Sequence, residues 1–123
     1  GGGAYVAGYA ASKAYDQVLG QSLWAELKPY GVDVMVLTAG ATDTPAMAKS
    51  GVEFGEFGVP MEPAEVAREG LENIGGGPTW VPGEQNRANA AMFKEAPLEA
   101  IIDAMTQGSM MLYNLPAPGP QSD

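Results

Sequence analysis

Hydrophobic residues recur with helical spacing in two long segments of the chain. In residues 9–27 they fall at offsets of 0, 4, 7, 8, 12 and 16, and in residues 98–112 at 0, 3, 4, 7, 11 and 14. Both series follow one face of a helix with 3.6 residues per turn. The positions are Ala11, Tyr15, Val18, Leu19, Leu23 and Leu27 in the first segment, and Leu98, Ile101, Ile102, Met105, Ser109 and Leu112 in the second.

The first predicted helix is followed directly by a predicted strand. Pro29 and Gly31 are typical of a helix end, and residues 32–37 form a short apolar run rich in valine. A run of this kind is expected for a strand buried on both faces of a parallel sheet. A second helix is predicted to begin at Pro63 and end before Gly75, and residues 79–82 are a second strand candidate. The order of elements indicates an α/β fold.

Composition excludes several functions. The net charge is −9, which argues against nucleic acid or an anionic membrane as a partner. The chain has no cysteine and no histidine, so disulfides and thiolate metal sites are excluded, and we expect no metal. We find no apolar run long enough to span a membrane, and the predicted terminal helix lacks a basic face. A reducing, cytoplasmic location is the expectation.

Tyr9 and Lys13 are the first candidates for chemistry. They are four residues apart and therefore share one face of the predicted helix. An ammonium beside a phenol lowers the tyrosine pKa from about 10 towards neutral. A tyrosine tuned in this way exchanges protons with a carbonyl or alcohol oxygen. The alternative is an amphipathic core tyrosine beside a solvated lysine.

Three ordered segments resemble the short-chain dehydrogenase/reductase family. Y-A-A-S-K-A at residues 9–14 resembles the active-site helix of that family, and L-W-A-E-L-K-P-Y-G-V-D-V at residues 23–34 resembles its helix-to-strand passage. A-G-A-T-D-T-P at residues 39–45 resembles its P-G-x-x-x-T loop. The resemblance implies the C-terminal portion of a Rossmann-type, doubly wound parallel sheet, and an oxidoreductase that moves hydride between NAD or NADP and a ketone or secondary alcohol.

The same resemblance assigns roles to individual residues. Tyr9 would be the general acid/base, and Lys13 would assist it and bind the nicotinamide ribose. Gly40, Thr42 and Thr44 would bind the cofactor, although ordinary turn chemistry is the alternative for the two threonines. Residues 45–60 would form a substrate lid. Its apolar side chains favour a lipid-like or aromatic carbonyl substrate: Phe54, Phe57, Val59 and Met61.

The chain also departs from the family pattern. The glycine-rich turn that follows the first strand in the family is absent, and the catalytic serine would lie upstream of Gly1. Ala39 replaces the usual proline. We therefore expect residues 1–114 to be the C-terminal part of a Rossmann-like domain that lacks its N-terminal dinucleotide-binding half. Residues 115–123, with three prolines, are expected to be a disordered tail.

Two alternatives to this reductase remain open. Sugar-nucleotide epimerases and dehydratases share the Y-x-x-x-K motif, but the chain after Thr44 is too short for their substrate domain. A truncated, non-catalytic chain that acts as an interaction or structural piece is the second alternative. In the family, the helix that starts at the tyrosine often packs against its copy, so we expect a homo-oligomer of the full-length form through residues 9–27.

The isolated 123 residues are expected to be poorly stable and inactive. The predicted central strand has at most one partner strand here, so its edges and faces would be exposed. Calorimetry and cofactor titration of the isolated chain check this expectation. A cooperative unfolding transition together with tight dinucleotide binding would contradict it.

Overall fold

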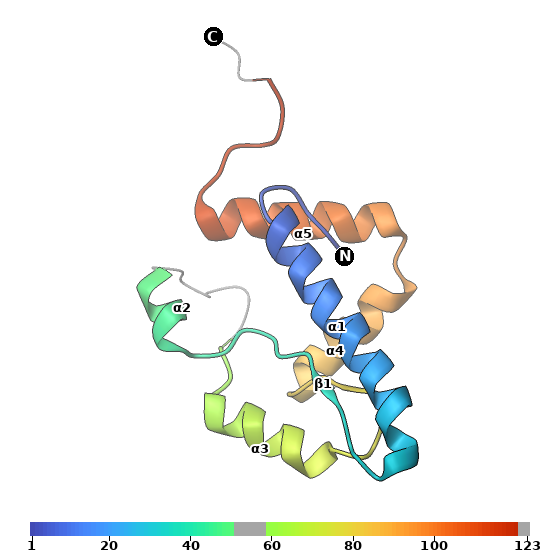
Figure 1. Ribbon diagram of the computed structural model, residues 1–123. Helices are drawn as coiled ribbons and strands as arrows, with labels where there is room; N and C mark the ends of the chain where they lie inside the picture. The colour runs from blue at the N-terminus through green and yellow to red at the C-terminus, as the bar shows by residue number, and fades with distance from the viewer. Residues whose placement is uncertain (51–58, 121–123) are drawn as a thin grey trace.

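The computed structural model describes residues 1–50 and 59–120, which form seven helices and strands and one 3₁₀ turn (Figure 1). The helices are α1 (Ala7–Leu27), α2 (Pro45–Ser50), α3 (Pro63–Asn73), α4 (Glu84–Glu95) and α5 (Leu98–Tyr113). The strands are β1 (Val36–Leu37) and β2 (Thr79–Trp80), and the 3₁₀ turn is Lys28–Tyr30. In the described part of the chain, no helix combines the length and apolarity needed to cross a membrane.

The two strands form a small parallel sheet. Val36 is paired with Thr79 and Leu37 with Trp80. Two flanking hydrogen bonds extend the ladder: the Val36 N–H donates to Pro78 O at 2.9 Å, and the Thr38 N–H donates to Trp80 O at 2.8 Å. The connection between the strands contains α3, as expected for parallel neighbours, which need a crossover. The result is a mixed α/β arrangement.

The strand predicted over residues 32–37 is longer than the observed one. Only Val36 and Leu37 are in strand conformation. A strand is defined by its ladder partners, and within the described residues the partner segment of β1 extends only from Pro78 to Trp80. The prediction of a full-length strand was therefore wrong for this chain, although the position of its carboxyl end was correct.

Helices cover the sheet on both faces. Gly20 of α1 lies so close to Val36 that a Cβ at position 20 would be 2.2 Å from Val36 Cγ2. A Cβ at Gly70 of α3 would be 3.0 Å from Leu37 Cδ2. Successive side chains of a strand point to opposite faces, so Val36 faces α1 and Leu37 faces α3. These two contacts fix both helices against β1.

The periodic helices are confirmed, and two helices, α2 and α4, were not anticipated. The structure contains the helices predicted at residues 9–27, from Pro63 and at residues 98–112, and Gly31 ends the first region with a left-handed φ of 72°. Helix α4 carries no long apolar stripe and was missed. Much of the apolar series of α1 remains exposed, with Tyr15 66% and Val18 61% exposed.

The N-terminal segment packs against α5. The Ala4 N–H donates to Thr106 Oγ1 at 3.0 Å, and the Tyr5 hydroxyl donates to Pro116 O at 2.8 Å. Tyr5 has a φ of 68°, a conformation that non-glycine residues rarely adopt. Figure 1 shows α5 crossing the first turns of α1. The start of α1 is thereby held in place by contacts from the far end of the chain.

The substitution Gly20→Ala is expected to destabilise the fold. The added methyl group would overlap the stiff, β-branched Val36 side chain, and overpacking of this kind costs about 1–3 kcal/mol. Gly108→Ala is the matched control, because position 108 is in α5 and has nothing within 4 Å of the added Cβ. Helix propensity then predicts stabilisation of up to about 1 kcal/mol.

Urea denaturation of the protein measures both changes. Equal free energies of unfolding for the two variants would contradict the proposed contact between α1 and β1.

Candidate functional site

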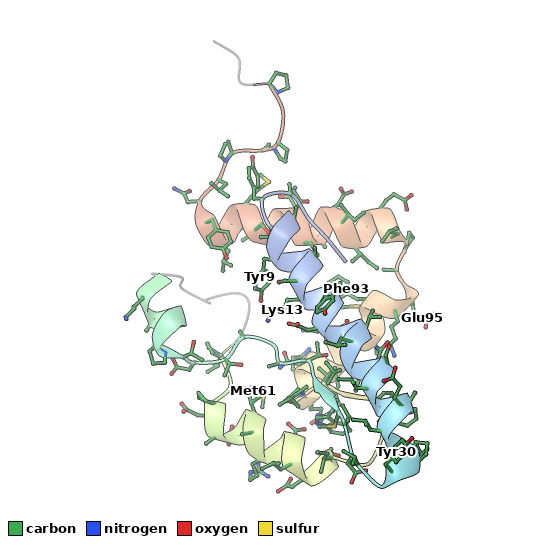
Figure 2. The ribbon with its side chains drawn as sticks, in the orientation of Figure 1. Tyr9, Lys13, Tyr30, Met61, Phe93 and Glu95 are labelled. Atoms are coloured by element: carbon green, nitrogen blue, oxygen red, sulfur yellow. The ribbon has the colours of Figure 1, made fainter. Side chains whose placement is uncertain are left out.

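Tyr9 and Lys13 lie on the same side of α1. The Lys13 Nζ atom is 5.8 Å from the centroid of the Tyr9 ring. Figure 2 shows both side chains on the side of the helix that faces the loop between β1 and α2. Both are accessible, since Tyr9 is 66% exposed and the Lys13 side chain 60%. The two residues that the sequence singled out are therefore neighbours in space and open to a ligand.

A cavity of about 400 Å³ lies between α1 and the end of β1. Because Gly20 packs on Val36, the preceding turns of α1 lie over the residues that follow the strand. The ends of parallel strands are where open α/β sheets bind ligands. The cavity brings together the predicted residues Tyr9, Lys13 and Gly40. It is completed by Asp16, Gln17, Val36, Leu37, Thr38 and Ala39.

Asp16 is a member of this site that the sequence reasoning did not identify. Its Oδ2 atom is 3.7 Å from Lys13 Nζ, in an (i, i+3) pair. Both side chains are more than half exposed, so the pair contributes little to stability. Both side chains line the cavity, so the pair places a positive and a negative charge side by side on its wall. The (i, i+3) spacing of an acid after Lys13 was the available signal.

The loop after β1 is hydrogen-bonded to Met61 at the end of the predicted lid. Thr42 and Met61 form an isolated parallel bridge. The Asp43 N–H donates to Met61 O at 2.9 Å, and the Met61 N–H donates to Ala41 O at 3.0 Å. The Thr42 hydroxyl donates to Gly40 O at 3.1 Å, which is the turn chemistry expected of a threonine. The loop 39–44 therefore has a defined shape.

The structure also describes three of the other predicted site residues, Thr44, Val59 and Met61. Thr44 directly precedes α2, and its carbonyl accepts the Ala48 N–H at 2.9 Å. Val59 is 94% exposed, whereas Met61 is partly buried. Phe54 and Phe57 lie outside the described residues. Of the two predicted lid residues that the structure describes, Met61 is the one hydrogen-bonded to the loop.

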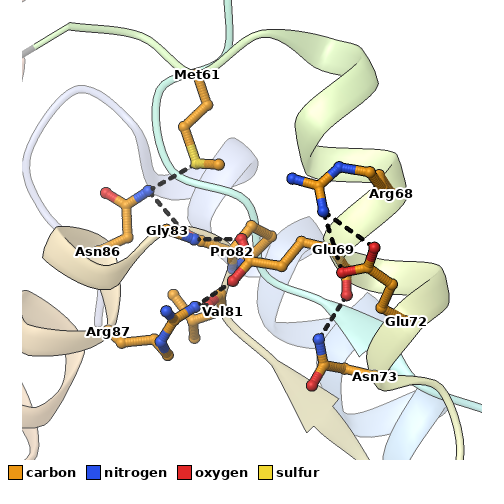
Figure 3. Close-up of polar contacts among 10 residues, drawn as sticks. All are labelled: Met61, Arg68, Glu69, Glu72, Asn73, Val81, Pro82, Gly83, Asn86 and Arg87. Atoms are coloured by element: carbon orange, nitrogen blue, oxygen red, sulfur yellow. Dashed lines mark hydrogen bonds and ion pairs between the residues drawn. The ribbon is translucent and has the colours of Figure 1, made fainter.

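Asn86, on the first turn of α4, was not anticipated and lies against the same loop at Gly40. Figure 3 shows its contacts with Met61 and Pro82. Its Nδ2 atom donates to Pro82 O at 2.9 Å and lies 3.6 Å from Met61 Sδ. A Cβ at Gly40 would be 2.7 Å from both Nδ2 and Oδ1 of this side chain. The close approach that glycine permits at position 40 is, in this structure, the approach of Asn86.

Glu69 anchors the start of α4 from the neighbouring helix α3. Its Oε2 atom accepts the Gly83 N–H at 2.7 Å, and its Oε1 atom accepts a hydrogen bond from Arg87. The hydrogen bond from Gly83, then that from Arg87, lowers the pKa of Glu69 below the ordinary value of 4.5. The Trp80 indole also contributes, although its Nε1 atom makes no hydrogen bond of normal geometry.

Comparison with known proteins identifies one informative relative. The chain is 36% identical over 84 residues to a 7beta-hydroxysteroid dehydrogenase of Clostridium sardiniense. The aligned region covers 68% of this chain and 32% of that protein. This chain is similar to a dehydrogenase. No family model and no solved structure matches.

The chain spans about a third of the length of that relative. The similarity therefore concerns one part of such a protein. Within residues 1–50 and 59–120, no group of three or more histidine, cysteine, aspartate or glutamate side chains is arranged to hold a metal ion. The candidate site brings together the Tyr9 phenol, the Lys13 ammonium and the loop around Gly40.

Acid is expected to weaken the anchoring of α4. A carboxyl whose pKa is lowered by folding stabilises the protein above its unfolded pKa, here 4.5. That contribution disappears as the pH falls from 4.5 through the lower folded pKa. Glu69→Gln should therefore reduce Tm clearly at pH 7 and much less at pH 3.

Glu95→Gln is the control, because it removes the same charge from the exposed end of α4. Thermal unfolding of the complete protein at several pH values measures the effect. A difference in Tm between wild type and Glu69→Gln that does not change with pH would contradict it.

Proposed function

We propose that this chain is the C-terminal portion of a short-chain dehydrogenase/reductase with a Rossmann-type parallel sheet. The observation that carries the proposal is the position of the Tyr9–Lys13 pair. Both residues line a cavity at the carboxyl end of a parallel strand, beside Gly40. The similarity to a dehydrogenase supports the same conclusion. The activity belongs to the complete protein, in which other segments contribute the remainder of the site.

The residues of the cavity fit the nicotinamide end of NAD or NADP. Lys13 offers ammonium donors to ribose hydroxyls, and Thr38 and Gly40 offer backbone groups and little steric bulk. A cavity of about 400 Å³ suits the nicotinamide riboside half of a dinucleotide rather than the whole molecule. The proposed cofactor would therefore extend beyond the surfaces that this chain supplies. Thr42 and Thr44 would fix the loop against it.

The proposed reaction is hydride transfer between the cofactor and a ketone or secondary alcohol. When bound, the cofactor supplies or accepts the hydride. In the direction of reduction, the Tyr9 hydroxyl donates its proton to the carbonyl oxygen, and in oxidation the phenolate removes the proton of the alcohol. Lys13 stabilises the phenolate by its positive charge. Asp16 places a carboxylate beside the ammonium in the same cavity.

The proposed substrate is an apolar carbonyl compound, lipid-like or aromatic. Val59 is almost fully exposed and precedes Met61, which is tied to the loop of the site. Exposed apolar side chains next to a site favour an apolar ligand. The hydroxysteroid named for the relative is a substrate of this chemical kind.

We also propose that the complete protein is a cytoplasmic homo-oligomer that uses α1. Tyr15, Val18 and Leu19 are exposed on this helix, with exposed fractions of 66%, 61% and 43%. Apolar groups of this size gain free energy when a partner surface removes them from water.

Tyr9→Phe is expected to abolish turnover while leaving cofactor binding nearly intact. Removing a general acid/base lowers the rate by roughly 10²–10⁴-fold. Tyr15→Phe is the matched control, since Tyr15 has the same exposure on the same helix and does not line the cavity. Lys13→Met should lower kcat and raise KM for the cofactor together.

The measurement is the change in absorbance of the nicotinamide cofactor with the complete protein and a panel of ketosteroids and aromatic ketones. A Tyr9→Phe variant as active as Tyr15→Phe would contradict the proposal and favour a non-catalytic role.

A further inference from the structure

We infer that Asn86 is a positioning residue, which holds the proposed cofactor-binding loop at Gly40 against the predicted lid residue Met61. The inference rests on the proposed function and adds a residue to it. Three segments that are distant in sequence meet at this side chain: the loop at Gly40, Met61 and the turn at Pro82. No feature of the sequence connects them. Their only common neighbour among the contacts described above is Asn86.

Both N–H hydrogens of the Asn86 carboxamide have an acceptor. Nδ2 carries two hydrogens, and the structure offers two acceptors, Pro82 O at 2.9 Å and Met61 Sδ at 3.6 Å (Figure 3). The carbonyl of Pro82 is a strong acceptor, and the thioether is a weak one. The first bond fixes the plane of the carboxamide, and the second orients the Met61 side chain towards it.

The face of the carboxamide supports Gly40. A Cβ at Gly40 would be 2.7 Å from Nδ2, 2.7 Å from Oδ1 and 2.8 Å from Cγ. Three nearly equal distances place the flat group broadside against the backbone of residue 40. Glycine-containing loops have many accessible conformations, so a wall on one side removes some of them. Asn86, which is not among the residues that line the cavity, thereby restricts the loop.

The position of Asn86 is itself determined by its surroundings. Gly83 begins α4 with a φ of 82°, and a Cβ there would be 2.8 Å from Met61 Sδ and 3.2 Å from Asn86 Nδ2. Glu69 holds the Gly83 N–H, and the Arg87 N–H donates to Gly83 O at 3.0 Å. The first turn of α4 is therefore anchored from α3, and Asn86 projects from a fixed base.

A restricted loop binds its ligand with a smaller loss of conformational entropy. The expected effect of Asn86 is thus on cofactor affinity and not on the proton transfer at Tyr9. In steady-state kinetics of the complete protein, Asn86→Ala should raise KM for the nicotinamide cofactor roughly three- to tenfold, the effect of one ordinary hydrogen bond. The value of kcat should stay within about twofold of wild type.

Asn89→Ala is the matched control. Asn89 is on the same helix, is exposed, and its side chain accepts a hydrogen bond from Gln85 at 3.1 Å. It should leave KM and kcat unchanged. Asn86→Asp keeps the size and shape of the side chain but removes the donors to Pro82 O and Met61 Sδ, so it should raise KM like Asn86→Ala. This variant decides the question if the alanine variant does not fold.

A double-mutant cycle with Gly40→Ala separates positioning from general stability. In the wild-type background the new Cβ collides with Asn86, and KM for the cofactor should rise. In the Asn86→Ala background the collision is removed, so Gly40→Ala should have a smaller effect. Additive effects, or an unchanged KM in Asn86→Asp, would overturn the inference. A wild-type protein without Tyr9-dependent turnover would instead overturn the proposed function.

Discussion

The parallel ladder between β1 and β2 is the contact on which the rest of the structure depends. It is only two residue pairs long, extended at each end by one hydrogen bond. Because the strands are parallel, their carboxyl ends lie at the same edge, so the residues after Leu37 and those after Trp80 become neighbours. The turn before α4 therefore meets the loop that starts at Thr38. The proximity of Asn86 to Gly40 therefore depends on this pairing.

Close packing of helices on both faces of β1 supports that short ladder. Gly20 and Gly70 let α1 and α3 approach the strand, and each would meet a β1 side chain if it carried a Cβ. The approach of α1 is also what carries Tyr9 and Lys13 over the end of the strand. The absence of a side chain at position 20 thus contributes to the site, because it allows the helix approach that positions Tyr9 and Lys13. Packing and chemistry are fixed by the same helix.

Sequence patterns predicted those parts of the molecule that depend on local spacing. The helices with periodic apolar residues, the end of the first helical region at Gly31 and the proximity of Tyr9 and Lys13 all follow from intervals of a few residues. Helix α4 was missed, because alanines and polar residues dominate it and no apolar stripe is present. The extent of β1 was overestimated, because hydrophobicity indicates burial whereas a strand also requires a hydrogen-bonded neighbour.

The role proposed for Asn86 could not be predicted from the sequence either, because it depends on contacts between distant segments. Its contact with Met61 spans 25 positions in sequence, and neither residue carries a local signal for the other. Met61 was predicted as an apolar lid residue, and its bridge to Thr42 depends on a fold that brings residues 42 and 61 together. Sequence reasoning proposed Tyr9 and Lys13 as the reacting groups, and the structure adds the contacts of the segments around them.

Both tryptophans of the chain lie beneath a cation: Lys28 is 4.7 Å from the Trp24 ring and Arg87 is 5.0 Å from the Trp80 ring. The excited state of indole is more polar than its ground state, so its emission wavelength responds to nearby charge. Trp80 is adjacent in sequence to the turn that Asn86 and Glu69 hold, whereas Trp24 lies near the far end of α1. The molecule therefore contains two tryptophan fluorophores, one beside the turn at Gly83 and one remote from it.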